Sequence, residues 1–287
     1  MKLLVTGATG QLGSLVVEAL LKIVPASRVA VSVRQPEKAD RFRALGVDVR
    51  QGDFDRPETL DRAFAGIDRL LLISTDGDNE TRILQHTSAV AAARRANVSF
   101  LAYTSLANAG DSKLFLAPVH QATEEAIRDS GIPYSFLRNN WYLENESSSI
   151  RAVLAGAPWV TSAAGGKVGW APRRDYAEAA ATVLAGTGHE NTVYELSGEL
   201  LTQEELVSAL GRTIGKDVPV LQVDDAAYAD IMKGAGVPEG FIPFLLAIQS
   251  GIREGELEVA SDDFAKLLGR PATPAAEALR GIVDGLA

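Results

Sequence analysis

Three glycines near the start of the chain have the spacing of a loop that could hold a phosphate group. Gly7, Gly10 and Gly13 lie in the stretch VTGATGQLG, directly after an apolar run and directly before an amphipathic one. A residue without a Cβ atom lets the chain turn tightly and lets backbone N–H groups approach a pyrophosphate, which a helix amino terminus also attracts. The stretch therefore predicts a strand, a loop and a helix that bind a dinucleotide through Gly7, Ala8, Thr9, Gly10, Gln11, Leu12 and Gly13.

Arg34 indicates which dinucleotide this would be. It stands at the expected end of the second strand, where a carboxylate would bind the 2′-hydroxyl of the adenosine ribose and repel a 2′-phosphate. Arginine offers a planar fork of donors that suits a phosphate, and Lys38 adds positive charge nearby. We therefore expect NADPH to be preferred over NADH. The alternative is that Arg34 is a solvated charge at a strand end.

Polar residues after the third and fourth expected strands complete the predicted cofactor site. Asp53, in the stretch QGDFD, is placed to accept a hydrogen bond from the adenine amino group. Ser74, Thr75 and Asp76 would line the middle of the cofactor. Each of them could instead serve only the local turn.

The elements that must position these residues alternate along the chain. Short runs apolar on both faces are separated by amphipathic helical stretches up to about residue 140, which is typical of a parallel sheet wound on both sides. The predicted fold class is α/β, a Rossmann doubly wound parallel sheet in residues 1–150 with a smaller α+β substrate-side domain in residues 151–287. The strand near residues 192–197 is a candidate to rejoin the main sheet.

Composition excludes several kinds of function. The 287 residues contain no cysteine, which excludes thiolate metal sites and thiol nucleophiles, and the net charge of −9 disfavours nucleic acid and anionic membranes as partners. No run of residues is long and apolar enough to span a membrane, and the three histidines have no carboxylate at ligand spacing, so no metal site is predicted. Without a secretory signal, a cytoplasmic location is expected. The oligomeric state is left open between monomer and homodimer.

Several longer stretches carry a family resemblance. They include GATGQLG, LLLIST, AYTSL, IPYSFLRNNWYLEN and SDDFAKLLG. With them the chain resembles the NmrA-like branch of atypical short-chain dehydrogenases/reductases, most closely the bacterial type 2 NAD(P)H:quinone oxidoreductases, with triphenylmethane dye reductases as near relatives. The resemblance implies an NADPH-binding Rossmann domain, a small domain that closes over the nicotinamide, and hydride transfer to a quinone.

The same resemblance implies that one segment contacts the nicotinamide side of the cofactor. Its residues here are Asn139, Asn140, Trp141, Tyr142, Leu143 and Glu144. The chain departs from the family pattern at Asn140, where glycine is usual, and at Trp170, where a small polar residue is usual. Arg173 is expected either to close over the cofactor phosphates or to cap the next helix.

The acid that most short-chain dehydrogenases use is absent. Their Tyr-x-x-x-Lys pair protonates a nascent alkoxide, but the corresponding stretch here reads His120-Gln-Ala-Thr-Glu124, and the role of Ser105, at the position of the helper serine, is left open. Reduction of a quinone gives a weakly basic phenolate that can take its proton from water, and hydride transfer to a cationic dye requires no proton. No catalytic acid is therefore assigned.

Aromatic side chains would then hold the acceptor. Trp141 and Tyr142 are the predicted stacking residues, and His120 is a candidate donor to a substrate carbonyl; the alternatives are core packing for the two aromatic residues and a cap or surface role for His120. An NADPH-dependent reductase of quinones is the leading hypothesis. The alternatives are a dye reductase and an NADP(H)-sensing regulator without turnover. An epimerase would need an acid/base pair that the sequence does not show.

Overall fold

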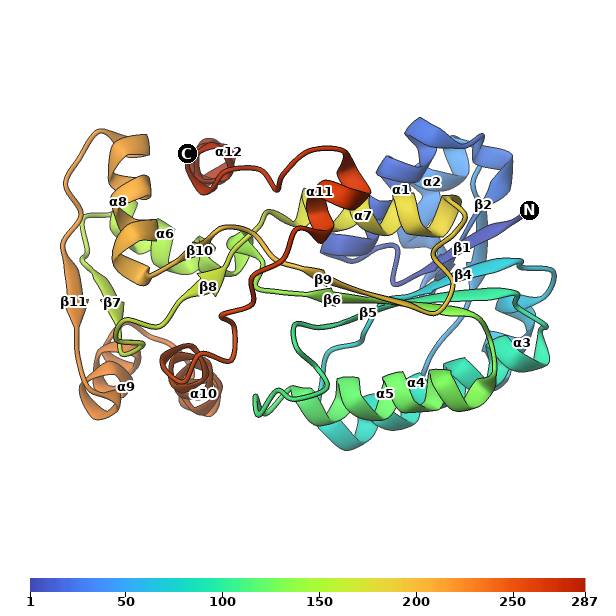
Figure 1. Cartoon of the computed structure of the whole chain (residues 1–287), viewed down its shortest axis with the longest axis horizontal. Helices are drawn as coiled ribbons and strands as arrows, with labels where there is room; N and C mark the ends of the chain where they lie inside the picture. The colour runs from blue at the N-terminus through green and yellow to red at the C-terminus, as the bar shows by residue number, and fades with distance from the viewer. Residues whose placement is uncertain (287) are drawn as a thin grey trace.

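The larger lobe is built around a seven-stranded sheet in which every strand pairs in parallel with its neighbours. The computed structural model describes residues 1–286 (Figure 1). The strand order is β3-β2-β1-β4-β5-β6-β9, with the crossover next to β1 that is typical of a Rossmann fold. The predicted fold class is confirmed. The strands are β1 (Leu3–Thr6), β2 (Val29–Val33), β3 (Asp48–Gln51), β4 (Arg69–Leu72), β5 (Phe100–Leu106), β6 (Tyr134–Asn139) and β9 (Thr192–Leu196).

Helices cover both faces of this sheet, so its central strands are buried and mostly apolar (Figure 1). Every residue of β1, β2, β4 and β5 is buried. One face packs against α1 (Gln11–Ile23), α2 (Asp40–Ala44), α7 (Arg173–Ala185) and α11 (Asp263–Leu268). The other face packs against α3 (Glu58–Phe64), α4 (Asn79–Arg95) and α5 (Ala117–Ser130).

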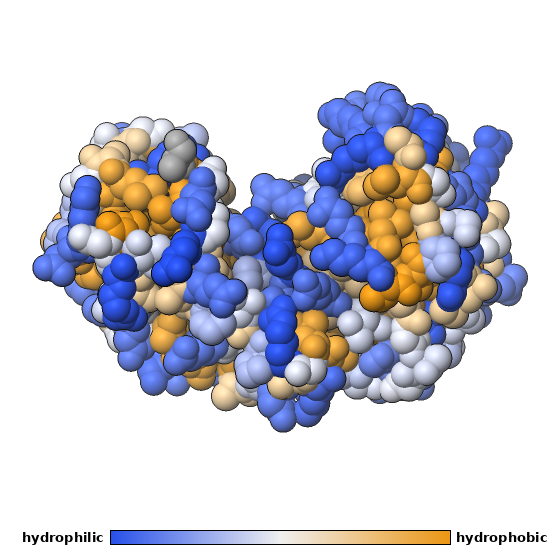
Figure 2. Space-filling view, turned by 90° about the horizontal axis from the view of Figure 1, so that it is seen from above, coloured by the Kyte–Doolittle hydropathy of each residue, from blue (hydrophilic) through white to orange (hydrophobic). Residues whose placement is uncertain are grey.

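The smaller lobe has its own hydrophobic core, which includes Trp159, Trp170, Leu206 and Ile252. Its sheets are two-stranded: β7 (Trp159–Thr161) runs parallel to β11 (Val220–Gln222), and β8 (Val168–Gly169) antiparallel to β10 (Leu200–Leu201). The molecule is hollowed between the lobes when seen from above (Figure 2). The helices of this lobe are α6 (Ser147–Leu154), α8 (Gln203–Ile214), α9 (Asp225–Gly234), α10 (Ile242–Arg253) and α12 (Ala275–Leu286).

The two lobes are interleaved along the chain. After the chain enters the smaller lobe with α6, it returns to the larger lobe with α7, which packs along α1, and with β9, which pairs with β6. It returns again with α11. The larger lobe therefore holds residues on both sides of the boundary predicted at residue 150, and the strand near residues 192–197 lies in the main sheet. No helix within residues 1–286 meets the length and hydropathy that a membrane span requires.

A wholly buried carboxylate ties the carboxyl-terminal segment to the larger lobe. Asp175, on α7, is 0% exposed. Its Oδ1 atom accepts hydrogen bonds from Arg270 Nη2 (2.9 Å) and Thr273 Oγ1 (3.0 Å), and its Oδ2 atom accepts one from the Thr273 amide. Both partners lie between α11 and α12, so this contact decides where the chain leaves for its last helix.

Replacement of Asp175 by asparagine should destabilise the fold. The amide group has one acceptor oxygen in place of two, so a donor would face a donor, and we expect the free energy of unfolding to fall by about 2–4 kcal/mol in urea denaturation. Glu178→Gln is the matched control. Glu178 also binds Arg270 (2.8 Å), but its side chain is 31% exposed, so the loss should stay below about 1 kcal/mol. Equal losses in the two variants would contradict this role of Asp175.

Candidate functional site

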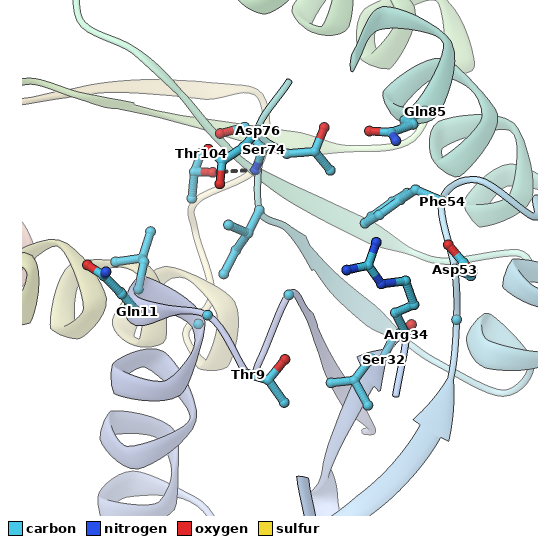
Figure 3. A pocket seen from close by; sticks show the side chains of 18 of the residues that line it. Thr9, Gln11, Ser32, Arg34, Asp53, Phe54, Ser74, Asp76, Gln85 and Thr104 are labelled. Carbon is cyan, nitrogen blue, oxygen red and sulfur yellow. Dashed lines mark hydrogen bonds between the residues drawn. The ribbon is translucent and has the colours of Figure 1, made fainter. Parts of the chain in front are cut away.

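A groove of about 700 Å³ crosses the carboxyl ends of the parallel strands, where ligands bind in open α/β sheets (Figure 3). It brings together most of the residues predicted for the cofactor site, although they come from distant parts of the sequence. The predicted residues that line it are Gly7, Thr9, Gly10, Gln11, Leu12, Gly13, Arg34, Asp53, Ser74, Thr75, Asp76, Tyr142 and Arg173.

The glycine loop forms the centre of the groove. Gly7 has φ +60°, a left-handed conformation that favours glycine. A Cβ atom on Gly13 would lie 2.3 Å from the Gly7 carbonyl oxygen, so α1 can start this close to β1 only without a side chain there. Gly10 precedes the first residue of α1 and offers no side-chain cap. The first N–H groups of α1 are thus left for an anion.

One end of the groove can hold a planar base and a phosphate. Arg34 and Lys38 line it, and the Arg34 guanidinium points across the groove toward Phe54 (Figure 3). Gln85 lies beside Phe54; its Nε2 atom donates to Asp55 (2.7 Å), whereas its Oε1 atom is enclosed and has no hydrogen-bond partner within residues 1–286. This end therefore combines two cationic groups, an aromatic face and one unused buried acceptor.

Asp53 lines the same end with its carboxylate partly engaged in the local turn. Its oxygens accept hydrogen bonds from the Asp55 amide (3.1 Å) and from Arg56 Nε (3.2 Å). The turn chemistry considered for this residue is thus present in the structure. Its expected contact with adenine stays a prediction.

The side chains of Thr104 and His86 fix the loop that follows β4. Thr104 Oγ1 accepts from the Ser74 amide (2.9 Å), and His86 Nε2 accepts from the Thr75 amide (2.9 Å). Because an amide can only donate, the His86 proton is on Nδ1, which lies 2.9 Å from Thr123 Oγ1. Burial, with the nearby charge of Arg82, lowers the pKa of His86 to about 3, so the ring is neutral.

Tyr142 and Arg173 line the far end of the groove. The Tyr142 ring packs edge-on against Tyr176, and its hydroxyl accepts from Asn139 Nδ2 (2.9 Å). The Arg173 guanidinium lies 5.1 Å from the centre of the Tyr142 ring. Both carboxylate oxygens of Glu144 accept from the Arg173 amide (3.0 Å), so Glu144 caps the first turn of α7.

The structure does not bring the other predicted residues to the wall of the groove. Asn140 Nδ2 donates to Ser197 Oγ (3.1 Å) and to the Leu257 carbonyl (3.0 Å), which joins β6 to the smaller lobe. Trp141 packs on the core of the smaller lobe, and its Nε1 atom donates to Glu146 (3.1 Å). The remaining side chains are buried ones that lie outside the groove lining: Ala8, Asn139, Leu143 and His120. Their predicted contacts stay predictions.

His120 is a buried, neutral residue. It is 6% exposed, and its Nδ1 atom lies 2.9 Å from the hydroxyl of Tyr103. Burial, with the nearby charge of Arg82, lowers the pKa of His120 to about 3. No cluster of three potential metal ligands occurs in the part of the chain that the structure describes.

A buried ion network contains Glu124, which stands at the position of the lysine in the missing Tyr-x-x-x-Lys pair. Glu124, 2% exposed, accepts a hydrogen bond from the Ser105 hydroxyl (2.7 Å) and two from Arg138 (2.8 and 2.9 Å). Arg138 also donates to Glu195 (3.0 Å). These hydrogen bonds and charges, those of Glu124 foremost, raise the pKa of Arg138 above its ordinary value. The hydroxyl proton of Ser105 is already donated in the hydrogen bond to Glu124, so this network has no acid that could protonate an alkoxide.

Sequence reasoning missed several residues that line the groove. Phe54 adjoins Asp53 at the end of a strand, and that position was a usable signal. Gln85 and Thr104 carried no signal, because the rotation of α4 and the pleat of β5 decide which side chains face the groove. The lining residues not predicted are Ser32, Val33, Gln35, Gly52, Phe54, Asp55, Ile73, Gln85 and Thr104.

Comparison with known proteins agrees with this geometry. The model of the NmrA-like family matches residues 1–256. The chain belongs to the NmrA-like family. A curated relative, quinone oxidoreductase 2 of Escherichia coli, is 42% identical over 276 residues, which cover 96% of each chain.

Two solved NmrA-like structures are similar over nearly their whole length. The NADPH complex of an NADPH-dependent quinone oxidoreductase from Escherichia coli has a TM-score of 0.93 and 41% identity, and covers 98% of this chain and 99% of that one. The NADP(H) complex of triphenylmethane reductase from Citrobacter sp. has a TM-score of 0.92 and 43% identity, with coverage of 98% and 100%. The recognition made from sequence is confirmed.

The contact between Gly13 and Gly7 can be tested directly. Gly13→Ala should force the loop to shift, lower the free energy of unfolding by about 1–3 kcal/mol and weaken dinucleotide binding, as measured by urea denaturation and by quenching of protein fluorescence. Gly165→Ala is the control, because no atom lies within 4 Å of a Cβ built there. If both variants bound dinucleotide as the unchanged protein does, the loop would not be the binding site.

Proposed function

We propose that this chain is an NADPH-dependent oxidoreductase that transfers a hydride to quinone-type acceptors. The observation that carries the proposal is a contrast within one site. The groove has a glycine cradle and cationic groups for a dinucleotide phosphate, whereas the position of the usual tyrosine acid holds the buried, neutral His120 and that of its lysine holds Glu124, which is bound to Arg138. Quinones are acceptors whose reduction needs no positioned acid.

The residues of the groove fit NADPH. The close approach of Gly13 to Gly7 leaves room for a pyrophosphate on the N–H groups of α1. Arg34 and Lys38 would bind the 2′-phosphate, and the unused Gln85 Oε1 atom would accept from the adenine amino group. When bound there, NADPH supplies the hydride. Relatives that are 41% and 43% identical bind NADPH and NADP(H) respectively.

The chain's own residues then bind the acceptor and orient it. Tyr142, fixed by Tyr176 and Asn139, forms a rigid aromatic wall at the end of the groove away from Arg34. His86 and Thr104 hold the backbone of Ser74 and Thr75, so the floor beside this wall is fixed before an acceptor arrives. Rate acceleration would come from proximity and orientation rather than from proton transfer by a side chain.

Cationic triphenylmethane dyes are the second candidate acceptors. They are favoured by the likeness to triphenylmethane reductase, because a dye cation is neutralised by hydride and needs no acid either. A cytoplasmic location and a monomeric or homodimeric assembly remain the expectations from sequence. Hydride transfer depends on neither of them.

A panel of acceptors tests the function. The purified protein should oxidise NADPH with at least one benzoquinone, naphthoquinone or triphenylmethane dye. The loss of NADPH absorbance measures this reaction. Tight NADP(H) binding with no turnover across the panel would instead indicate the redox-sensing regulator. A pull-down that recovers a protein partner would then support that reading, and a pull-down without one would count against it.

Arg34→Ala tests the choice of cofactor. Loss of a charge-assisted hydrogen bond to phosphate should weaken NADPH binding by about 10- to 100-fold and leave NADH binding within about threefold. Arg41→Ala is the control, because Arg41 is exposed, pairs with Glu18 and does not line the groove. Equal effects of Arg34→Ala on the two cofactors would refute its role at the 2′-phosphate.

A further inference from the structure

Arg82, on α4, is a buried cation that contacts no carboxylate in the described part of the chain, although the charge of Asp76 acts on it from a greater distance. Its side chain is 6% exposed, and Nε is fully enclosed with no hydrogen-bond partner within residues 1–286. It forms no ion pair with a carboxylate in that part of the chain. A buried charge that is neither paired nor hydrogen-bonded lowers stability. Its presence here calls for a compensating interaction.

Another buried arginine shows how this fold ordinarily treats such a group. Arg69, on β4, is equally buried at 6% exposure. Its guanidinium donates to the carbonyls of Leu184 (2.8 Å) and Val183 (3.1 Å) and pairs with Glu190 (3.6 Å). Arg69 is thus satisfied by the protein itself, whereas Arg82 is not. The difference points to a ligand at Arg82.

Arg82 lies behind the groove. It is in the first turn of α4, directly after the loop in which Thr75 and Asp76 line the groove. Its Cγ atom lies 4.0 Å from the position that a Cβ atom on Gly77 would take, and His86, one turn further along α4, binds the amide of groove-lining Thr75 (2.9 Å). It thus adjoins the floor of the groove rather than the end formed by Arg34 and Lys38.

We propose that Arg82 stabilises the negative charge that forms on the acceptor oxygen when a quinone is reduced, an assignment that rests on the proposed reductase function. A quinone that accepts a hydride gains one hydrogen and two electrons and becomes the hydroquinone monoanion, while NADPH becomes NADP⁺. The anion then takes a proton from water, which leaves hydroxide. A preorganised cation beside the developing charge lowers the barrier to the hydride step.

This assignment separates the two classes of acceptor. A quinone becomes more negative as it reacts, so Arg82 favours its reduction. A triphenylmethane cation becomes neutral, so a fixed positive charge beside it gives no help to the reaction and opposes binding of the dye. One substitution should therefore change the two activities differently.

The kinetic test compares Arg82→Met with Arg82→Lys. In Arg82→Met, kcat/KM for a neutral benzoquinone should fall about 10- to 100-fold, whereas kcat/KM for a triphenylmethane cation should stay the same or rise. Arg82→Lys restores the charge and should recover part of the quinone activity. An equal fall with both acceptors would mean that Arg82 only supports the fold and would overturn the proposal.

Thermal stability gives a readout that does not depend on turnover. Arg82→Met removes an unpaired buried charge and keeps a side chain of similar length, so its Tm should equal or exceed that of the unchanged protein. Arg69→Met is the matched control. It breaks satisfied hydrogen bonds and should lower Tm without changing the ratio of quinone to dye activity. A fall in Tm for Arg82→Met as large as that for Arg69→Met would contradict the assignment.

Binding of a stable phenolate isolates Arg82 from the reaction. The measurement uses the NADP⁺ complexes of the unchanged protein and of Arg82→Met, at a pH at which 4-nitrophenol is ionised. The unchanged protein should bind 4-nitrophenolate at least about tenfold more tightly than the variant does. Neutral 4-nitroanisole should bind the two proteins with equal affinity. Equal affinity of 4-nitrophenolate for the two proteins would overturn the role of Arg82. Silence of the unchanged protein with every quinone and dye would instead overturn the reductase function, so the two failures are distinguishable.

Discussion

The contact between Gly13 and the carbonyl of Gly7 is the constraint from which the groove follows. A helix can start within this distance of the strand before it only where neither residue carries a side chain in the way. The contact aims the amino terminus of α1 at the edge of the sheet where the parallel strands end. All other lining groups are then arranged around that point: Arg34 after β2, Asp53 after β3, and Ser74 after β4.

The buried ion network decides which chemistry this edge of the sheet can support. Glu124, Arg138 and Glu195 satisfy one another, so their desolvation is offset, and Ser105 is held as a donor to Glu124. Glu124, at the position of the lysine that would lower the pKa of a tyrosine acid, is thus part of the scaffold between α5 and the sheet. The site can therefore bind an acceptor, orient it and stabilise charge, but it cannot donate a proton. This suits an acceptor whose reduced form is a weak base.

A short segment after β6 joins the groove to the smaller lobe. Tyr142 faces the groove and Glu144 caps α7, while Asn140 and Trp141 bind or pack on the smaller lobe. Residues that are neighbours in sequence therefore serve different lobes here.

The sequence by itself determined those features that depend on neighbours along the chain. The glycine loop, the alternation of apolar strands with helices, Arg34 at a strand end and the absence of Tyr-x-x-x-Lys were all readable, and with them the Rossmann fold and most of the lining of the groove. These signals are local because turn geometry and burial on both faces of a strand constrain residue type directly.

Only the tertiary structure decided which side chains meet. It turned Asn140, Trp141 and His120 away from the groove wall, brought in Gln85 and Thr104, and returned α7 and β9 to the larger lobe. It also left Arg82 buried and unpaired. The rotation of a helix, the pleat of a strand and the packing of distant segments set these outcomes, because a side chain's surroundings are made by residues far from it in sequence.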